Sequence, residues 1–188
     1  MIELVYETHS QTVDNERGIA TGWLPGRLSV KGQGFARALG ERRRADGLAV
    51  VFTSDLARAV ETAEIAFGDS DLPVREDWRL RECNYGELNG RPVAELDAEK
   101  PHRIDRPFPG GESYREVVAR TKSFLDDLSA EFDEARILLI AHSANRWALE
   151  HLLLGASLED LVAAPFEWQE GWEYRLLCPD AEDRAHDR

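Results

Sequence analysis

Short apolar runs alternate with helix-forming stretches along this chain, and that alternation constrains the fold more than any other feature. Residues 2–6, 48–52 and 136–141 are apolar runs of the length of buried strands. The stretches between them carry helical spacing and helix-capping residues. Strands that alternate with helices build an open sheet covered by helices. The sequence therefore predicts an α/β sandwich with a mostly parallel sheet.

Capping and turn residues set the limits of the predicted elements. Ser29 and Glu112-Ser113 open helices, and Gly155 closes one. We expect strands at 2–6, 48–52, Val74, 136–141 and 172–177, helices at 30–45, 55–67, 92–99, 112–132, 143–154 and 157–163, and irregular chain at 78–90. No repeat or linker divides them, so residues 1–178 are predicted to form one domain. The charged tail 179–188 is expected to be disordered.

Charge and cysteine content narrow the function classes. The 188 residues include 36 acidic and 23 basic side chains, a formal net charge of −13. Nucleic acids and anionic membranes need basic patches, so we expect neither as a partner. The chain starts with a strand-like run rather than a signal peptide, so Cys83 and Cys178 are expected to be reduced thiols. These features predict a cytoplasmic protein and leave a homodimer open.

Two histidines follow two of the predicted strands directly. His9 comes after the run at 2–6, and His142 after the run at 136–141. In open α/β sheets ligands bind beyond the carboxyl ends of the strands. His9 and His142 are therefore the leading candidates for a functional site.

Four motifs surround these histidines in a specific order. They are Thr8-His9-Ser10, Ser54-Asp55-Leu56-Ala57-Arg58-Ala59, Leu80-Arg81-Glu82 with Gly86 and Gly90, and Ala141-His142-Ser143. Together they resemble the histidine phosphatase (phosphoglycerate mutase-like) superfamily from Leu4 to about Leu154. The resemblance implies a three-layer α/β/α sandwich and phosphoryl transfer to or from a small phosphorylated substrate, with no metal and no cofactor.

The resemblance also implies a role for each catalytic residue. His9 matches the nucleophile, which forms a phosphohistidine that water then hydrolyses. Arg58 and His142 match the groups that bind the phosphoryl oxygens. Glu82 matches the proton donor to the leaving oxygen, which requires a raised pKa.

A second set of residues is expected to bind the substrate. Polar side chains crowd the segment after His9, and Thr21-Gly22 belongs to the same motif region. Serine replaces glycine after both histidines and adds a hydroxyl group at each place. The predicted substrate-binding residues are Ser10, Asn15, Arg17, Thr21, Gly22 and Ser143.

Thr8 departs from the family pattern, because the family carries a phosphate-binding arginine there. Threonine cannot supply that charge, and loss of one such donor typically costs ~10²–10³ in rate. Arg17, in the loop after His9, is the first candidate to replace it. A phosphomonoesterase is the first hypothesis, since the segment from Gly90 to Pro109 is short and Pro109-Gly110-Gly111-Glu112-Ser113 resembles the phosphatase branch. A phosphoglycerate mutase-type phosphotransfer and a catalytically weak or silent phosphate-binding module stay open as alternatives.

Overall fold

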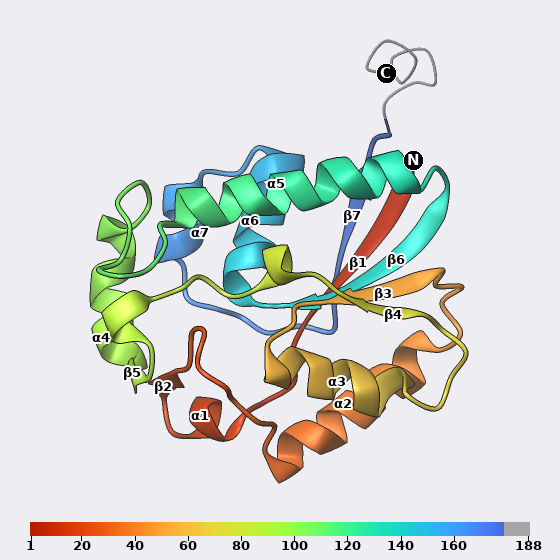
Figure 1. Ribbon diagram of the computed structural model, residues 1–188, viewed down its shortest axis with the longest axis horizontal. Helices are drawn as coiled ribbons and strands as arrows, with labels where there is room; N and C mark the ends of the chain where they lie inside the picture. Colours follow the sequence, from red (N-terminus) through yellow and green to blue (C-terminus); the bar gives the residue numbers. More distant parts are fainter. Residues whose placement is uncertain (179–188) are drawn as a thin grey trace.

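A five-stranded sheet forms the centre of the molecule in a computed structural model that describes residues 1–178. Its order is β4 (Val74–Glu76), β3 (Val50–Thr53), β6 (Ala135–Ala141), β1 (Ile2–Thr8) and β7 (Trp172–Leu176). Neighbouring strands are parallel except β7, which runs antiparallel to β1 at one edge (Figure 1). The mostly parallel sheet predicted from the sequence is confirmed.

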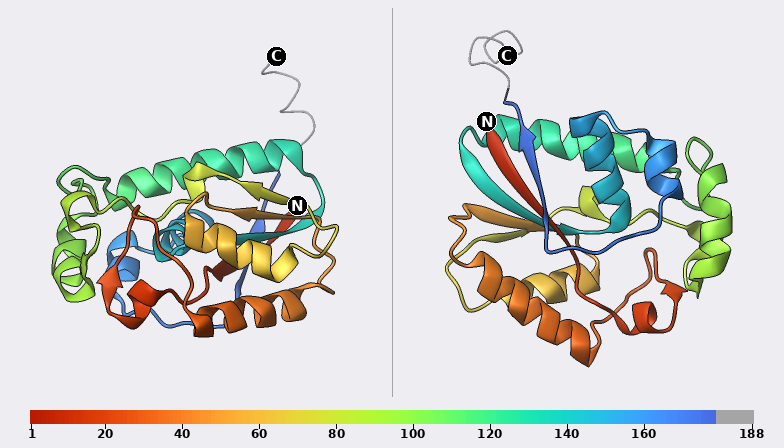
Figure 2. Two further views of the ribbon diagram at one scale, coloured as in Figure 1. Left: turned by 60° about the horizontal axis from the view of Figure 1, so that its bottom comes forward. Right: turned by 180° about the vertical axis from the view of Figure 1, so that it is seen from behind.

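Helices cover both faces of this sheet, so the fold is the expected three-layer sandwich (Figures 1 and 2). One face carries α2 (Val30–Arg43) and α3 (Ala57–Phe67), and the other α5 (Tyr114–Glu131) and α6 (Ser143–Leu154). In β1, Leu4 and Tyr6 pack in the cluster with Phe124 of α5, whereas Val5 packs with Leu39 of α2. Burial on both faces explains why the strands are continuous apolar runs.

A smaller lobe lies beyond the carboxyl end of the sheet, and we call residues 84–112 of it the cap. It contains β5 (Arg91–Pro92), paired with β2 (Ile19–Ala20), and α4 (Val93–Glu99). The short helix α1 (Val13–Glu16) lies in the loop after β1, and α7 (Leu158–Ala163) follows α6. Tyr85 and Phe108 of the cap pack in one apolar cluster with Trp147 of α6. The sequence missed α1, β2 and β5, which are too short to show periodicity.

The predicted helix caps are confirmed. The Ser29 hydroxyl oxygen accepts a hydrogen bond from the Gly32 amide at 3.1 Å, and Ser113 forms a capping box with Glu116. Gly155 ends α6 with a left-handed φ of 70°. Several ends differ from the prediction by one or two residues. One of them matters for the site: α3 begins at Ala57 rather than at residue 55, and the Ser54 hydroxyl group before it contacts His142.

Other expectations have mixed outcomes. The irregular segment 78–90 contains 3₁₀ turns at Trp78–Leu80 and Gly86–Leu88.

Neither Cys83 nor Cys178 is in a disulfide, as predicted. The tail 179–188 lies outside the described residues. None of the described helices has the length and apolar character needed to cross a membrane.

Candidate active site

The structure brings His9 and His142 side by side at the carboxyl end of the sheet. They follow β1 and β6, which pair in parallel with Thr8 opposite Ala141. The His9 amide donates to the carbonyl of Ala141 at 2.9 Å, and the two imidazole centroids are 5.0 Å apart. The parallel pairing of β1 and β6 therefore places both rings at the carboxyl end of the sheet.

The backbone fixes the proton of the His9 ring. His9 Nδ1 lies 2.8 Å from the carbonyl oxygen of Ser10, and a carbonyl can only accept. Nδ1 therefore carries the proton, and Nε2 presents a lone pair. The Ser10 amide in turn donates to Thr62 Oγ1 on α3 at 3.0 Å, which holds this loop against the helix.

Arg58 lies between the two histidines. It is the second residue of α3, and only 2% of its surface is exposed. Its Nε–H donates to His9 Nε2 at 3.3 Å, and its Nη2 lies 3.3 Å from His142 Nδ1 and donates to the Gly22 carbonyl at 2.8 Å. Burial, and then the Arg58 charge, lower the pKa of His9 to about 3. The His9 ring is therefore neutral near pH 7.

His142 is held from three sides. Its Nε2 is 2.7 Å from Ser54 Oγ, and the Tyr6 hydroxyl group donates to its carbonyl oxygen. Burial is the main cause, and the Arg58 charge the second, of a His142 pKa well below its usual range. Because Arg58 can only donate, His142 Nδ1 accepts and Nε2 carries the proton toward Ser54.

Glu82 lies in the irregular segment that follows the first 3₁₀ turn, and its carboxyl group is near enough to Arg58 to interact with its charge. Burial raises the pKa of its carboxyl group, although the Cys83 amide, 2.7 Å from Oε1, opposes that shift. Its backbone carbonyl accepts from Trp23 Nε1 at 2.7 Å and from Arg120 Nη2 at 3.0 Å. A carboxyl group with a raised pKa that is fixed in place suits a general acid.

Three of the residues predicted to bind substrate lie next to these groups. The Ser10 carbonyl oxygen contacts His9, and the Gly22 carbonyl oxygen contacts Arg58. Ser143 begins α6 directly after His142. Gly22 has φ 54°, and a Cβ there would overlap Asn89 Oδ1. Only glycine fits this approach between the Gly22 loop and the cap.

The other three are placed differently. The Thr21 hydroxyl group donates to Asp14 Oδ2 at 2.8 Å, and Asn15 Oδ1 accepts from the Thr12 amide as part of the α1 capping box. Arg17 is exposed at the end of α1, and no hydrogen bond or ion pair of its side chain exists within residues 1–178. The structure does not bring Asn15 or Arg17 into contact with the histidines.

Sequence reasoning missed the residues that support the site. Ser54 begins the second motif and Thr62 follows it three residues after its end, so their hydroxyl groups were visible signals. Arg120 gave no signal, because it is one of three basic residues, with Arg115 and Lys122, on a long amphipathic helix. It nevertheless bonds to Glu82 O, to Arg79 O at 2.6 Å and to the carboxylate of Glu112 at 3.0 Å.

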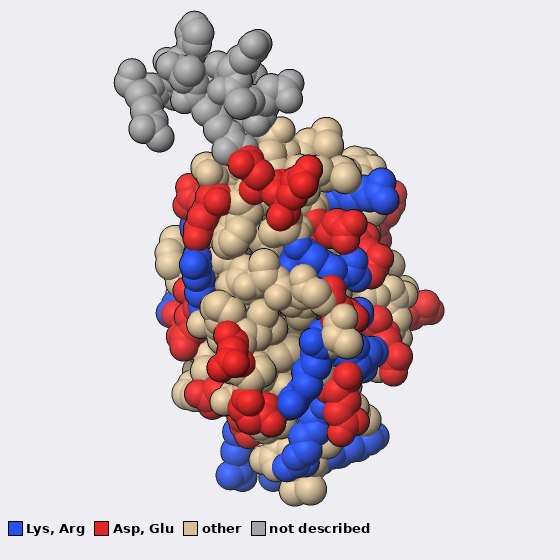
Figure 3. All heavy atoms as spheres, turned by 90° about the vertical axis from the view of Figure 1, so that its right-hand side faces the viewer, with Lys and Arg blue, Asp and Glu red and all other residues tan. Residues whose placement is uncertain are grey.

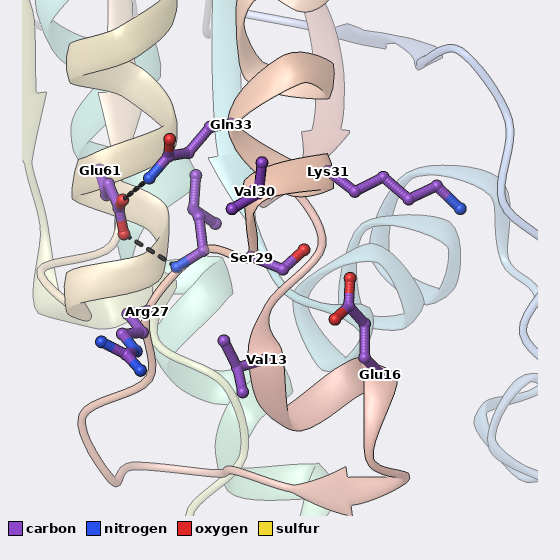
Figure 4. Close-up of a pocket in the computed structure, with 9 residues that line it drawn as sticks. Val13, Glu16, Arg27, Ser29, Val30, Lys31, Gln33 and Glu61 are labelled. Carbon is purple, nitrogen blue, oxygen red and sulfur yellow. Dashed lines mark hydrogen bonds between the residues drawn. The ribbon is translucent and has the colours of Figure 1, made fainter.

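A hollow of about 720 Å³ lies between α1, the start of α2 and α3 (Figure 4). It is lined by Val13, Glu16, Arg27, Leu28, Ser29, Val30, Lys31, Gln33 and Glu61. The carboxylate of Glu61 accepts from the Leu28 amide at 2.9 Å. The charges of Glu16 and Glu61 balance those of Arg27 and Lys31. Neither His9 nor His142 lines this hollow. The chemistry therefore centres on the histidine pair.

Comparison with known proteins agrees with this arrangement. The family model described as "Histidine phosphatase superfamily (branch 1)" matches residues 8–169, and the chain belongs to this superfamily. The 2,3-bisphosphoglycerate-dependent phosphoglycerate mutase 2 of Gloeobacter violaceus is 34% identical over 201 residues, covering 95% of this chain and 92% of the relative.

Solved structures include phosphatases. A mycobacterial glucosyl-3-phosphoglycerate phosphatase in complex with VO3 has a TM-score of 0.77 and 30% identity, with 87% of each chain covered. Bacillus stearothermophilus YhfR has a TM-score of 0.79 and 27% identity over 90% of this chain and 88% of its own. The protein is thus an enzyme of the phosphatase and phosphomutase type.

Proposed function

We propose that the protein is a metal-independent, cytoplasmic phosphomonoesterase that acts on a small phosphorylated metabolite through a phosphohistidine on His9. The hydrogen bond between His9 Nδ1 and the Ser10 carbonyl carries this proposal, because it directs the Nε2 lone pair toward Arg58 and His142. A neutral imidazole held in this way is a ready nucleophile for phosphorus.

The proposed first step transfers the phosphoryl group to the enzyme. Nε2 of His9 forms a bond to phosphorus while the bond from phosphorus to the ester oxygen breaks. The carboxyl group of Glu82 gives its proton to that oxygen, so the product leaves as an alcohol. The Arg58 guanidinium stabilises the phosphoryl oxygens, where charge develops, and His142 Nδ1, which accepts from Arg58, orients that guanidinium.

The second step returns the enzyme to its starting state. Water attacks phosphorus, the bond to His9 Nε2 breaks, and the Glu82 carboxylate takes a proton from that water. Inorganic phosphate leaves, and Glu82 is again protonated. The raised pKa of Glu82 supports both transfers, since the group takes up and releases a proton more readily near neutral pH.

A panel of phosphate monoesters, assayed with and without a chelator, tests the proposal. We expect hydrolysis that the chelator leaves unchanged and that His9→Ala abolishes. Net transfer of phosphate between two positions of a phosphoglycerate, at a rate above hydrolysis, would instead favour a mutase. No turnover of sugar, nucleotide or carboxylate phosphates at high enzyme concentration would favour the phosphate-binding module.

A further inference from the structure

Trp23, Arg81 and Asp55 form a contiguous group beside the backbone of Glu82. The Trp23 indole nitrogen bonds to the Glu82 carbonyl, and the Arg81 guanidinium lies over the Trp23 ring, 4.6 Å from its centroid. Arg81 also forms a two-pronged ion pair with Asp55, with Nε and Nη2 at 2.7 and 2.6 Å from the two carboxylate oxygens. Asp55 lies two residues before Ala57, the first residue of α3, whose first turn carries Arg58.

The position of Glu82 indicates which part of a substrate lies near Trp23, Arg81 and Asp55. A general acid must lie within hydrogen-bond reach of the leaving oxygen, so the departing alcohol lies on the Glu82 side of the phosphoryl group. Trp23, Arg81 and Asp55 are each partly exposed there. Because this group adjoins Glu82, we take its side chains to lie nearer the alcohol part of the substrate than the phosphate.

The charge of this group is internally balanced. The bond to Arg81 is the main cause of a lowered pKa for Asp55, and the bond to Asp55 is the main cause of a raised pKa for Arg81. Both groups therefore stay charged near pH 7. The Arg81 guanidinium is already bound to Asp55, so it is not available to an anionic substituent on the alcohol. The Asp55 carboxylate repels such a substituent, since like charges side by side are unfavourable.

The cap offers little further positive charge. Three of its basic side chains form ion pairs with nearby carboxylates: Arg91–Glu95, Lys100–Asp97 and Arg103–Glu99. Arg115, at the start of α5, pairs with Asp105 of the cap. Arg106 is the exception within the described cap, and it is exposed in the loop before α5. The amide of Asn89 is also engaged, since its Oδ1 accepts from the Trp23 and Tyr85 amides.

We propose that this site selects phosphomonoesters of uncharged alcohols and that the Arg81–Asp55 pair rejects esters that carry a carboxylate or a second phosphate. This inference rests on the proposed function. The proposed substrate preference differs from that of relatives that are named for phosphoglycerate, an ester with a carboxylate. Asp55 is the repelling element, and Trp23 supplies an apolar ring surface for an uncharged alcohol.

A matched pair of ligands tests the selection. sn-Glycerol 3-phosphate and 3-phosphoglycerate have the same three-carbon length and differ by a hydroxymethyl group against a carboxylate. Calorimetry on the full chain, with His9→Ala present in every variant so that neither ester is turned over, should give a dissociation constant about tenfold lower for glycerol phosphate. In Asp55→Asn, which leaves the Arg81 charge unbalanced, binding of 3-phosphoglycerate should tighten roughly tenfold, with glycerol phosphate within about twofold.

Asp69→Asn is the matched control. Asp69 follows the far end of α3 and pairs with Arg44 at 2.6 Å, so this variant removes the same charge without touching Arg81. It should leave the ratio of the two dissociation constants unchanged. The inference is overturned by equal or tighter binding of 3-phosphoglycerate to the chain in which His9→Ala is the sole change, by saturable binding of neither ester, or by an equal effect of the two Asp→Asn variants.

This measurement is independent of turnover. If neither ester is hydrolysed but the preference and its response to Asp55→Asn persist, the phosphatase proposal fails and the selection stands. If an aryl phosphate is hydrolysed through His9 and the preference is missing, the selection fails and the phosphatase proposal stands.

Discussion

The two sides of the active site are built in different ways. On the phosphate side, His9, Arg58 and His142 come from the ends of two paired strands and the first turn of a helix. On the leaving-group side, Glu82 comes from irregular chain whose carbonyl is held by Trp23 and Arg120. The phosphate side depends on regular secondary structure, whereas the leaving-group side depends on hydrogen bonds between segments far apart in sequence.

This difference indicates where remote substitutions change the chemistry. Strand pairing places His9 and His142 through many backbone bonds, so no single side chain decides their positions. The Glu82 segment instead depends on the buried Arg120–Glu112 pair, and Glu112 also holds the Asn84 amide at 2.9 Å. Loss of one such partner leaves the other charge buried without compensation.

His9→Ala should have the largest effect, because it removes the nucleophile of the phosphate side. Turnover is expected to fall by roughly 10⁴-fold or more, as for other covalent catalysts that lose their nucleophile. Rapid quenching of the wild type with labelled substrate should trap an acid-labile, base-stable phosphate that His9→Ala lacks. Label on a serine, or label that persists in His9→Ala, would show that the phosphate side works differently.

Glu82→Gln should discriminate between leaving groups. We expect a loss of ~10²–10⁴-fold for an alkyl phosphate, whose leaving oxygen needs a proton in the transition state. An activated aryl phosphate needs little protonation, so its turnover should change much less. Steady-state kinetics with both esters measures the contrast. Equal losses would mean that Glu82 positions groups and does not donate a proton.

Arg120→Gln should act through Glu82, and this prediction sharpens the contrast between the two sides. We expect a loss of about 10²-fold for an alkyl phosphate, the scale of a misplaced catalytic group, and a smaller loss for an aryl phosphate. In a Glu82→Gln background the same change should cost little more, so the double-mutant cycle is strongly non-additive.

Arg136→Gln is the control for Arg120, because Arg136 pairs with Glu3 and Glu173 near the amino end of β6. It should not alter the ratio of alkyl to aryl turnover. Thermal unfolding of both variants separates lost stability from lost positioning. Additive effects of Arg120→Gln and Glu82→Gln would show that Arg120 does not work through the acid.

The pH profile should be one-sided. His9 has a pKa of about 3, so its nucleophilic nitrogen stays unprotonated down to roughly that pH. Glu82 has a raised pKa and must be protonated to donate, so turnover of an alkyl phosphate should fall as pH rises through that pKa. The slope should approach tenfold per pH unit, and Glu82→Gln should remove it. An acidic limb near pH 6 would contradict the neutral, buried His9.

Arg17→Ala should have the smallest effect. The side chain is exposed and contacts none of the three phosphate-side residues, so kcat/KM should stay within about twofold. A loss of ~10²-fold would instead show that Arg17 folds over the phosphate and replaces the arginine absent at Thr8. Thr8→Arg in the Arg17→Ala background should then restore part of that loss.

The contrast between the two sides also explains what the sequence could predict. The sheet, the main helices and the meeting of His9 with His142 follow from apolar runs, caps and strand order, which are local signals. The support of Glu82 by Arg120 and the pairing of Arg81 with Asp55 are tertiary, and no spacing along the chain encodes them. Ser54 shows the same limit, since its place in the second motif does not reveal that its hydroxyl group contacts His142 in the fold.

The hydrogen bond from Arg58 Nε–H to His9 Nε2 has a consequence for the resting protein. While that bond is made, the nitrogen that attacks phosphorus is masked from other electrophiles. A phosphate ester that draws the guanidinium onto its own oxygens releases the lone pair at the moment of binding. The reactive atom is thus exposed by the molecule it is meant to attack, and acylating or alkylating metabolites without a phosphate meet a histidine whose nucleophilic nitrogen is already engaged.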